Sequence, residues 1–88
     1  MSYEIEWTAS ALRELHKLDK QTGRRIALAV TALGTDPRPP GCRPLTGQPA
    51  GVMRIRIGDH RVIYQVEDSR VLVTVVRVAH RREVYRKL

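Results

Sequence analysis

A strict alternation of apolar and arginine residues opens the second half of the chain. Met53, Ile55 and Ile57 alternate with Arg54 and Arg56. This period of two places apolar side chains on one face of a β-strand and guanidinium groups on the other. The pattern therefore predicts a strand over residues 53–57 with one basic face.

A tight turn at Gly58-Asp59 follows, and it predicts a β-hairpin with a second strand over residues 61–66. Glycine at the first central position favours a two-residue type II′ turn. The cross-strand pairs expected from that turn are Ile57 with His60, Arg56 with Arg61, and Arg54 with Ile63. Like charges directly opposite each other are unfavourable unless an anion lies between them. A slip of one residue in register would move every arginine to the opposite face.

We interpret this basic face as a phosphate-binding surface, because the planar donor fork of arginine matches phosphate oxygens. The alternative, which stays open at this point, is a solvated face whose arginines only confer solubility.

The remaining apolar patterns predict two helices and two further strands. Alternation over residues 3–7 indicates a short strand, and Trp7 is expected to anchor the core. Thr8 or Ser10 can cap a first helix, and Asp19 can cap a second one that ends at Gly34. The apolar stripes expected to be buried are Leu12, Leu15 and Leu18 in the first helix and Ile26, Ala29, Val30 and Leu33 in the second.

Residues 35–51 contain all five prolines and three glycines of the chain and are predicted to form a loop. The nearly continuous β-branched run over residues 71–78 indicates a central strand covered on both faces. We predict a single α+β domain over residues 1–88. Its antiparallel-rich, four-stranded sheet carries an N-terminal antiparallel helix pair on one face, in the order β-α-α-β-β-β, with a short C-terminal tail or helix.

Charge points to an anionic partner. The 88 residues carry a formal net charge of +7, and 13 of the 16 basic residues are arginines. From Met53 onward, nine basic residues stand against four acidic ones. Such a distribution is expected for a protein that binds nucleic acid or a strongly acidic protein. An anionic membrane is disfavoured, because the basic residues fall on strands rather than on an amphipathic helix.

The single cysteine, Cys42, excludes an internal disulfide, and no paired Cys or His ligands indicate a metal site. We expect no cofactor and no metal. The N-terminus lacks the basic start and apolar run of a signal peptide, and no apolar stretch approaches the ~20 residues needed to span a bilayer. These features predict a cytoplasmic protein.

Two motifs resemble one known family closely. The run R-x-R-x-G-x-x-R-x-x-Y, which begins at Arg54, and the ending H-R-R-E-V-Y, which begins at His80, look like the RelE/ParE superfamily of bacterial toxin-antitoxin toxins, on the RelE side. The resemblance covers essentially the whole chain. It implies a metal-independent, ribosome-dependent messenger-RNA endonuclease that cuts in the ribosomal A site, by attack of a ribose 2′-hydroxyl on the adjacent phosphate.

The resemblance also implies catalytic residues and partners. The positions that match catalytic residues of the family are Arg54, Arg56, Arg61, Arg81 and Tyr85. Arg38, Arg43 and Arg82 are candidates for additional RNA contacts. The expected partners are a cognate acidic antitoxin, messenger RNA in the A site and ribosomal RNA.

The proton acceptor needs a separate candidate. The best-known family pattern has lysines on the second strand, one of them proposed as the general base, whereas this chain has arginines there. An arginine cannot readily take a proton at neutral pH. We predict that His80 lies near the arginines and acts as the base; the alternative is that it merely caps the last strand.

Two rival functions remain. The ParE branch of the superfamily inhibits DNA gyrase and cuts no RNA. A non-catalytic basic module would use the same arginines only to position RNA or an acidic protein.

Overall fold

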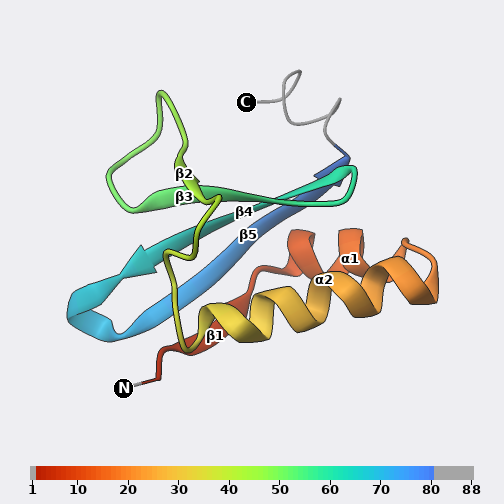
Figure 1. Ribbon diagram of the computed structural model, residues 1–88, viewed down its shortest axis with the longest axis horizontal. Coiled ribbons are helices and arrows are strands. Elements are labelled where there is room, and N and C mark those ends of the chain that lie inside the picture. Colours follow the sequence, from red (N-terminus) through yellow and green to blue (C-terminus); the bar gives the residue numbers. More distant parts are fainter. Residues whose placement is uncertain (1, 81–88) are drawn as a thin grey trace.

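The structure, a computed structural model, describes residues 2–80. Strand β1 (Glu4–Trp7) leads into helices α1 (Ala9–His16) and α2 (Lys20–Leu33). Strands β2 (Arg43–Pro44), β3 (Val52–Ile57), β4 (His60–Glu67) and β5 (Leu72–His80) follow, with a short 3-10 turn at Asp68–Arg70 between β4 and β5. Both helices lie on the same side of the sheet (Figure 1).

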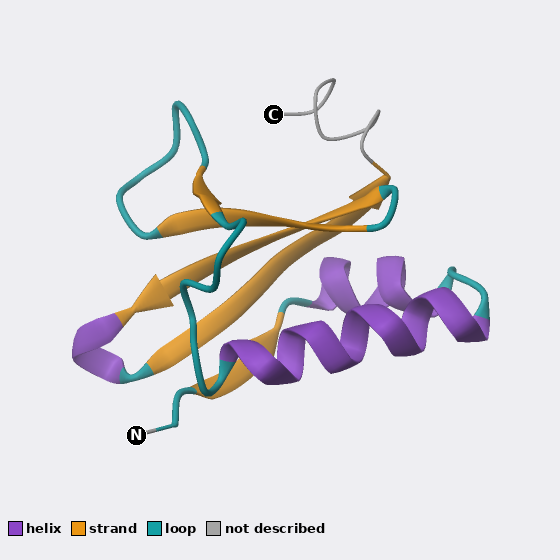
Figure 2. Ribbon diagram, in the orientation of Figure 1, coloured by secondary structure: helices purple, strands orange, loops and turns teal. Residues whose placement is uncertain are grey.

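The sheet has five strands in the order β1-β5-β4-β3-β2 (Figure 2). β1 runs parallel to β5, and all other neighbours are antiparallel. The predicted α+β class and helix pair are confirmed, whereas the strand count was one too low. The extra strand comes from the loop, where Arg43 pairs with Arg54 and Pro44 pairs with Met53. A proline is tolerated there because β2 is at the edge of the sheet.

The helices begin where the sequence predicts. The Thr8 side chain accepts a hydrogen bond from the Ala11 N–H, and the Asp19 side chain accepts one from the Thr22 N–H. These caps satisfy amide groups that have no partner within the helix. α2 ends at Leu33, and Gly34 is its C-cap, as expected.

The core lies between the helices and the helix-facing side of the sheet. Ile26, Val30 and Leu33 of α2 are at most 1% exposed, and they join Val62, Tyr64, Val66, Val73 and Val75 of the sheet. Trp7 packs against this cluster, as predicted. The prediction for α1 was wrong in part, because Ala11 is the fully buried residue and Leu12 is 38% exposed. The short side chain of Ala11 lets the helix lie close to the sheet.

The outer face of the sheet has a smaller apolar cluster. Ile63 and Ala79 are each 2% exposed and are packed with Leu45, Val52 and Val76. Leu45 comes from the loop that follows β2, so this loop covers part of the outer face. The predicted cover on both faces of β5 is therefore confirmed in part, because Thr74 and Val76 are only half-buried. Within the described residues, no helix is long and apolar enough to cross a membrane.

Candidate functional site

The β3–β4 hairpin has the predicted register. Ile57 pairs with His60, and Arg56 lies directly opposite Arg61. Gly58 has a φ of 60°, a backbone conformation that glycine adopts without steric cost. The hairpin therefore holds Arg56 and Arg61 side by side on the outer face of the sheet.

Four arginines converge at this face. Arg54 and Arg56 of β3, Arg61 of β4 and Arg43 of β2 line one pocket of about 200 Å³, together with Gly41. Arg43 enters because β2 pairs with β3 and sets Arg43 opposite Arg54. Gly41 presents no side chain, which leaves this side of the pocket open. The predicted convergence of Arg54, Arg56 and Arg61 is thus present, and Arg43 joins them.

Arg61, which lines the pocket, has a buried donor without a partner among the described residues. Nη1 of Arg61 is shielded from solvent and has no hydrogen-bond partner among the described residues. Arg56 donates from Nε to the carbonyl oxygen of Gly58 over 3.1 Å, which fixes its side chain along the turn. A buried donor without a partner costs about 1–3 kcal/mol. An anion in the pocket would supply acceptors for this donor and relieve the repulsion between the paired arginines.

The loop that delivers Arg43 is anchored at its N-terminal end. The buried Tyr64 hydroxyl donates to the carbonyl oxygen of Pro37 over 2.8 Å. Arg38 forms a two-point contact with Asp68, with distances of 3.1 Å from Nη1 and 3.0 Å from Nη2. Tyr3 also donates to Asp68, over 2.7 Å. Hydrogen bonds from Arg38 and then Tyr3 lower the pKa of Asp68 below its ordinary value.

This arrangement changes the role of Arg38. The sequence made Arg38 a candidate for RNA contact, but its guanidinium is held by Asp68 and does not line the arginine pocket. Asp68 lies in the β4–β5 connection, 30 residues away from Arg38 in the chain. A local sequence pattern therefore could not predict this ion pair. We therefore assign Arg38 to loop anchoring.

His80 lies on the other face of the sheet, so its predicted position beside the arginines was wrong. A β-bulge is the reason: Ile63 pairs with Arg77 and Tyr64 pairs with Val75, which leaves Val76 as an extra residue in β5. One extra residue reverses the alternation of faces beyond it. His80 consequently pairs with His60, and their rings meet edge to face at 5.6 Å between centroids.

The two histidines line a pocket on the helix side of the sheet with residues of α1 and the α1–α2 connection, among them Glu14 and Lys17. Arg81, Arg82 and Tyr85 lie outside the described residues. The prediction that they complete the arginine pocket therefore stays a prediction.

Glu14 is a structural residue that the sequence did not reveal. Its Oε1 accepts the Val78 N–H over 2.8 Å, and its Oε2 accepts Arg77 Nη2 over 3.0 Å. β1 pairs with β5 only as far as Val75. Beyond that point, Glu14 provides the acceptor for the β5 backbone N–H of Val78. Its position between Arg13 and Leu15 on a helix gave no signal for this contact, which depends on how α1 packs on the sheet.

The geometry favours anion binding. Among the described residues, those that line the pocket are four arginines and a glycine, and none of these accepts a proton near neutral pH. The pocket can thus hold a phosphate and stabilise additional negative charge on it. Cys42, next to Gly41 and Arg43, is a half-buried free thiol.

Comparisons with known proteins give a consistent result. The chain matches the family model described as "ParE toxin of type II toxin-antitoxin system, parDE" over residues 5–85. Toxin RelG of Mycobacterium tuberculosis is 33% identical over 88 residues, covering 99% of this chain and 100% of that protein.

Solved structures agree with the sequence relatives. The toxin-antitoxin complex RelBE2 from Mycobacterium tuberculosis contains a chain with a TM-score of 0.78 and 30% sequence identity, covering 91% of this chain and 99% of that chain. The archaeal RelE-RelB complex from Pyrococcus horikoshii gives a TM-score of 0.80 at 26% identity, covering 92% of this chain and 97% of that chain.

Proposed function

Because the chain belongs to the RelE/ParE superfamily of type II toxin-antitoxin toxins, we propose that it is a ribosome-dependent endoribonuclease that cuts messenger RNA in the ribosomal A site. The observation that carries this proposal is the pocket formed by Arg43, Arg54, Arg56 and Arg61. A surface that only needed a positive charge would not require two arginines directly opposite each other with one donor left unsatisfied.

The proposed reaction is an internal transesterification. The ribose 2′ oxygen attacks the adjacent phosphorus, and the bond from phosphorus to the 5′ oxygen breaks. The 2′-hydroxyl loses its proton, the 5′ oxygen gains one, and the products are a 2′,3′-cyclic phosphate and a free 5′-hydroxyl. The pentacoordinate intermediate carries more negative charge on phosphorus oxygens than the substrate does, and fixed guanidinium groups stabilise that extra charge.

Arg61 has the central role in this proposal. Its Nη1 has no partner among the described residues, so it is available to a phosphate oxygen without breaking an existing hydrogen bond. Arg56 is held by its contact with Gly58, and Arg43 closes the side of the pocket toward β2. Losing one such fixed donor costs roughly 10²- to 10³-fold in rate.

Proton transfer is not assigned to His80. His80 lies with His60 on the helix side, which argues against direct contact with a phosphate in the pocket. We propose that Arg81 and Tyr85 complete the site, Arg81 as a further phosphate contact and Tyr85 by stacking on a base or orienting the phosphate. Replacement of His80 by alanine is then expected to leave cleavage largely intact.

An acidic antitoxin is the proposed protein partner. The structures of relatives described as RelBE2 and RelE-RelB are toxin-antitoxin complexes. The net charge of +7 in this chain favours an acidic protein that covers the arginines.

The matching family model is named after ParE toxins. Inhibition of DNA gyrase is therefore the alternative function to be tested. Purified protein incubated with ribosomes and a defined messenger distinguishes the two. We expect A-site cleavage with cyclic phosphate ends, and we expect Arg61→Ala to slow that cleavage roughly 10²- to 10³-fold. Gyrase inhibition without any RNA cleavage would refute the proposal and support the ParE activity. If the protein shows neither activity, the proposal is also refuted, and a non-catalytic binding module is the interpretation that is left. Expression without an antitoxin should arrest growth through loss of translation.

A further inference from the structure

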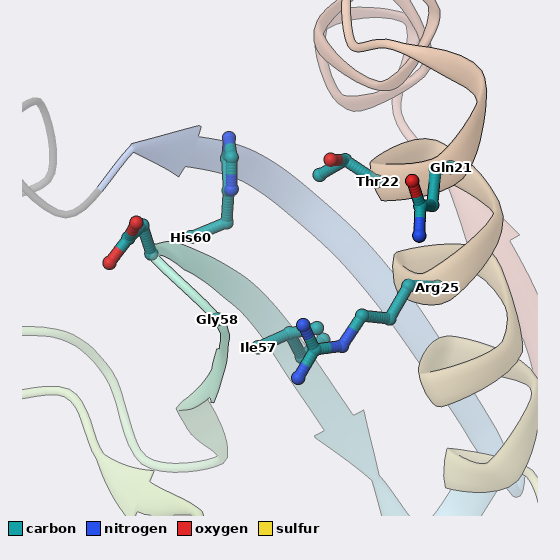
Figure 3. A pocket seen from close by; sticks show the side chains of 7 residues that line it. Gln21, Thr22, Arg25, Ile57, Gly58 and His60 are labelled. Carbon is teal, nitrogen blue, oxygen red and sulfur yellow. The ribbon is translucent and has the colours of Figure 1, made fainter.

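A second pocket lies on the opposite side of the same hairpin turn. It has a volume of about 250 Å³ and is lined by Gln21, Thr22 and Arg25 of α2 and by residues 57–60 of the hairpin. Figure 3 shows the Arg25 side chain extending from α2 toward Ile57 and Gly58. The pocket therefore joins the start of α2 to the tip of the hairpin that carries Arg56 and Arg61.

Among the described residues, Arg25 forms no ion pair with an acidic side chain. Its Nη1 lies 3.4 Å from the position that a Cβ on Gly58 would occupy, so the absence of a side chain at residue 58 gives the guanidinium room. Asp59 lines the same pocket, but the ion pairs within the described residues involve Asp68, Glu67 and Glu14 instead.

Gly58 thus has an arginine on each side. On the outer face Arg56 donates to its carbonyl oxygen, and on the helix face the guanidinium of Arg25 lies next to the position that a Cβ on Gly58 would occupy. His60, the next residue but one, points to the helix side and lines the pocket with Arg25 (Figure 3). Among the described residues that line the two pockets at this turn, Arg25, Arg56 and Arg61 are positive and only Asp59 is negative, so the net charge at the hairpin tip is positive.

We propose that the pocket at Arg25 binds a second backbone phosphate of RNA, so that the RNA passes around the hairpin tip and is contacted on both sides of it. This inference deepens the proposed function and rests on it for the identity of the anion. The outer pocket holds the scissile phosphate, and Arg25, with Gln21 and Thr22 as further hydrogen-bonding groups, holds another. The phosphate belongs either to the messenger or to ribosomal RNA, which share this backbone chemistry.

The salt dependence of binding tests the proposal. Each phosphate contact contributes about 0.7 to the slope of log affinity against log salt concentration for a single strand. Arg25→Gln should lower that slope by about 0.7, so that between about 50 and 200 mM salt the parent loses roughly 2.5-fold more affinity than the variant. The probes are a fluorescent single-stranded RNA oligonucleotide and purified small ribosomal subunits without messenger.

Arg24→Gln is the matched control. It removes the same charge from the neighbouring residue of α2, but Arg24 lines a groove between the helices with Leu15 and Leu18. The control should keep the parental slope. Asp59→Asn should tighten binding, because it removes the one negative charge from the pocket.

The two RNA probes separate the sources. A changed slope on the oligonucleotide supports a messenger contact, and a change on the ribosomal subunit alone supports a ribosomal RNA contact. Equal slopes for Arg25→Gln, Arg24→Gln and the parent on both probes would overturn the inference. Cleavage by the parent on complete ribosomes is measured separately, so failure of the proposed nuclease is distinguishable from failure of the second phosphate site.

Discussion

Replacing Arg61 by methionine should stabilise the free protein while it destroys activity. Nη1 of Arg61 is shielded from solvent and lacks a partner among the described residues, a situation that costs about 1–3 kcal/mol. The cross-strand repulsion from Arg56 adds about 0.2–1 kcal/mol. Methionine keeps the length of the aliphatic stem and removes both costs. We therefore expect the free energy of unfolding to rise by at least about 1 kcal/mol.

Thermal unfolding followed by circular dichroism measures this change. For a domain of this size, about 1 kcal/mol corresponds to an increase in Tm of about 4–8 °C. Arg24→Met is the matched control, because Arg24 is exposed on α2 and a surface change of this kind stays within about 0.5 kcal/mol. Inorganic phosphate should raise the Tm of the parent more than that of Arg61→Met, since only the parent retains this ligand for the anion.

The opposite result would refute the reasoning. If Arg61→Met unfolds at a lower temperature than the parent in phosphate-free buffer, the guanidinium contributes net stability. The pocket would then not be destabilised by the absence of an anion. A variant that is more stable yet cleaves at the parental rate would instead remove Arg61 from the proposed mechanism. The expected combination, higher Tm with cleavage reduced at least roughly 10²-fold, is that of a site optimised for binding at the expense of stability.

Three structural predictions complete the set. Glu14→Ala should lower the free energy of unfolding by about 2–3 kcal/mol in urea titrations, because the Val78 N–H loses its acceptor; Glu14→Gln keeps an acceptor oxygen and should lose less. Asp68→Asn should make the free energy of unfolding depend less on pH in the acidic range. The hydrogen bond from Arg38 lowers the folded pKa of Asp68 below 3.8, so its contribution is present above that value and is lost as pH falls through the lowered pKa; an unchanged acid slope would contradict this. Gly51→Ala should cost about 2 kcal/mol or more, because φ is 92° and a Cβ would meet a β4 backbone oxygen at 2.8 Å; a parental urea midpoint would exclude that clash.

Much of the fold follows from local patterns. The alternation at residues 53–57 and the turn at Gly58-Asp59 specify the pairing of Arg56 with Arg61, because turn type fixes the register of a hairpin. The caps at Thr8 and Asp19 follow from side chains that can accept amide hydrogen bonds. The strand at Arg43–Pro44 was missed, since two residues among five prolines show no periodicity.

The candidate site divides in the same way. Arg54, Arg56 and Arg61 were predicted to gather because they lie on one hairpin, where neighbours in space are close in sequence. Arg43 and Arg25 arrive from a loop and a helix, so their positions depend on long-range packing. His80 was expected in a tail that runs over the sheet edge towards the arginines, whereas β5 extends as far as His80. The bulge at Val76, which no glycine or proline marks in the sequence, then turns His80 to the helix side.

The sequence by itself determined the order of the helices and of every strand except Arg43–Pro44, the helix caps, the hairpin register and the convergence of its three arginines. All of these arise from interactions between residues near each other in the chain. Only the tertiary structure decided that Arg38 anchors a loop through Asp68, that Arg43 enters the pocket, that Glu14 completes the β5 edge, and that His80 faces the helices. The physical reason is that side-chain alternation specifies two faces only locally. A single inserted residue exchanges those faces, and the packing of distant segments selects which charged groups meet.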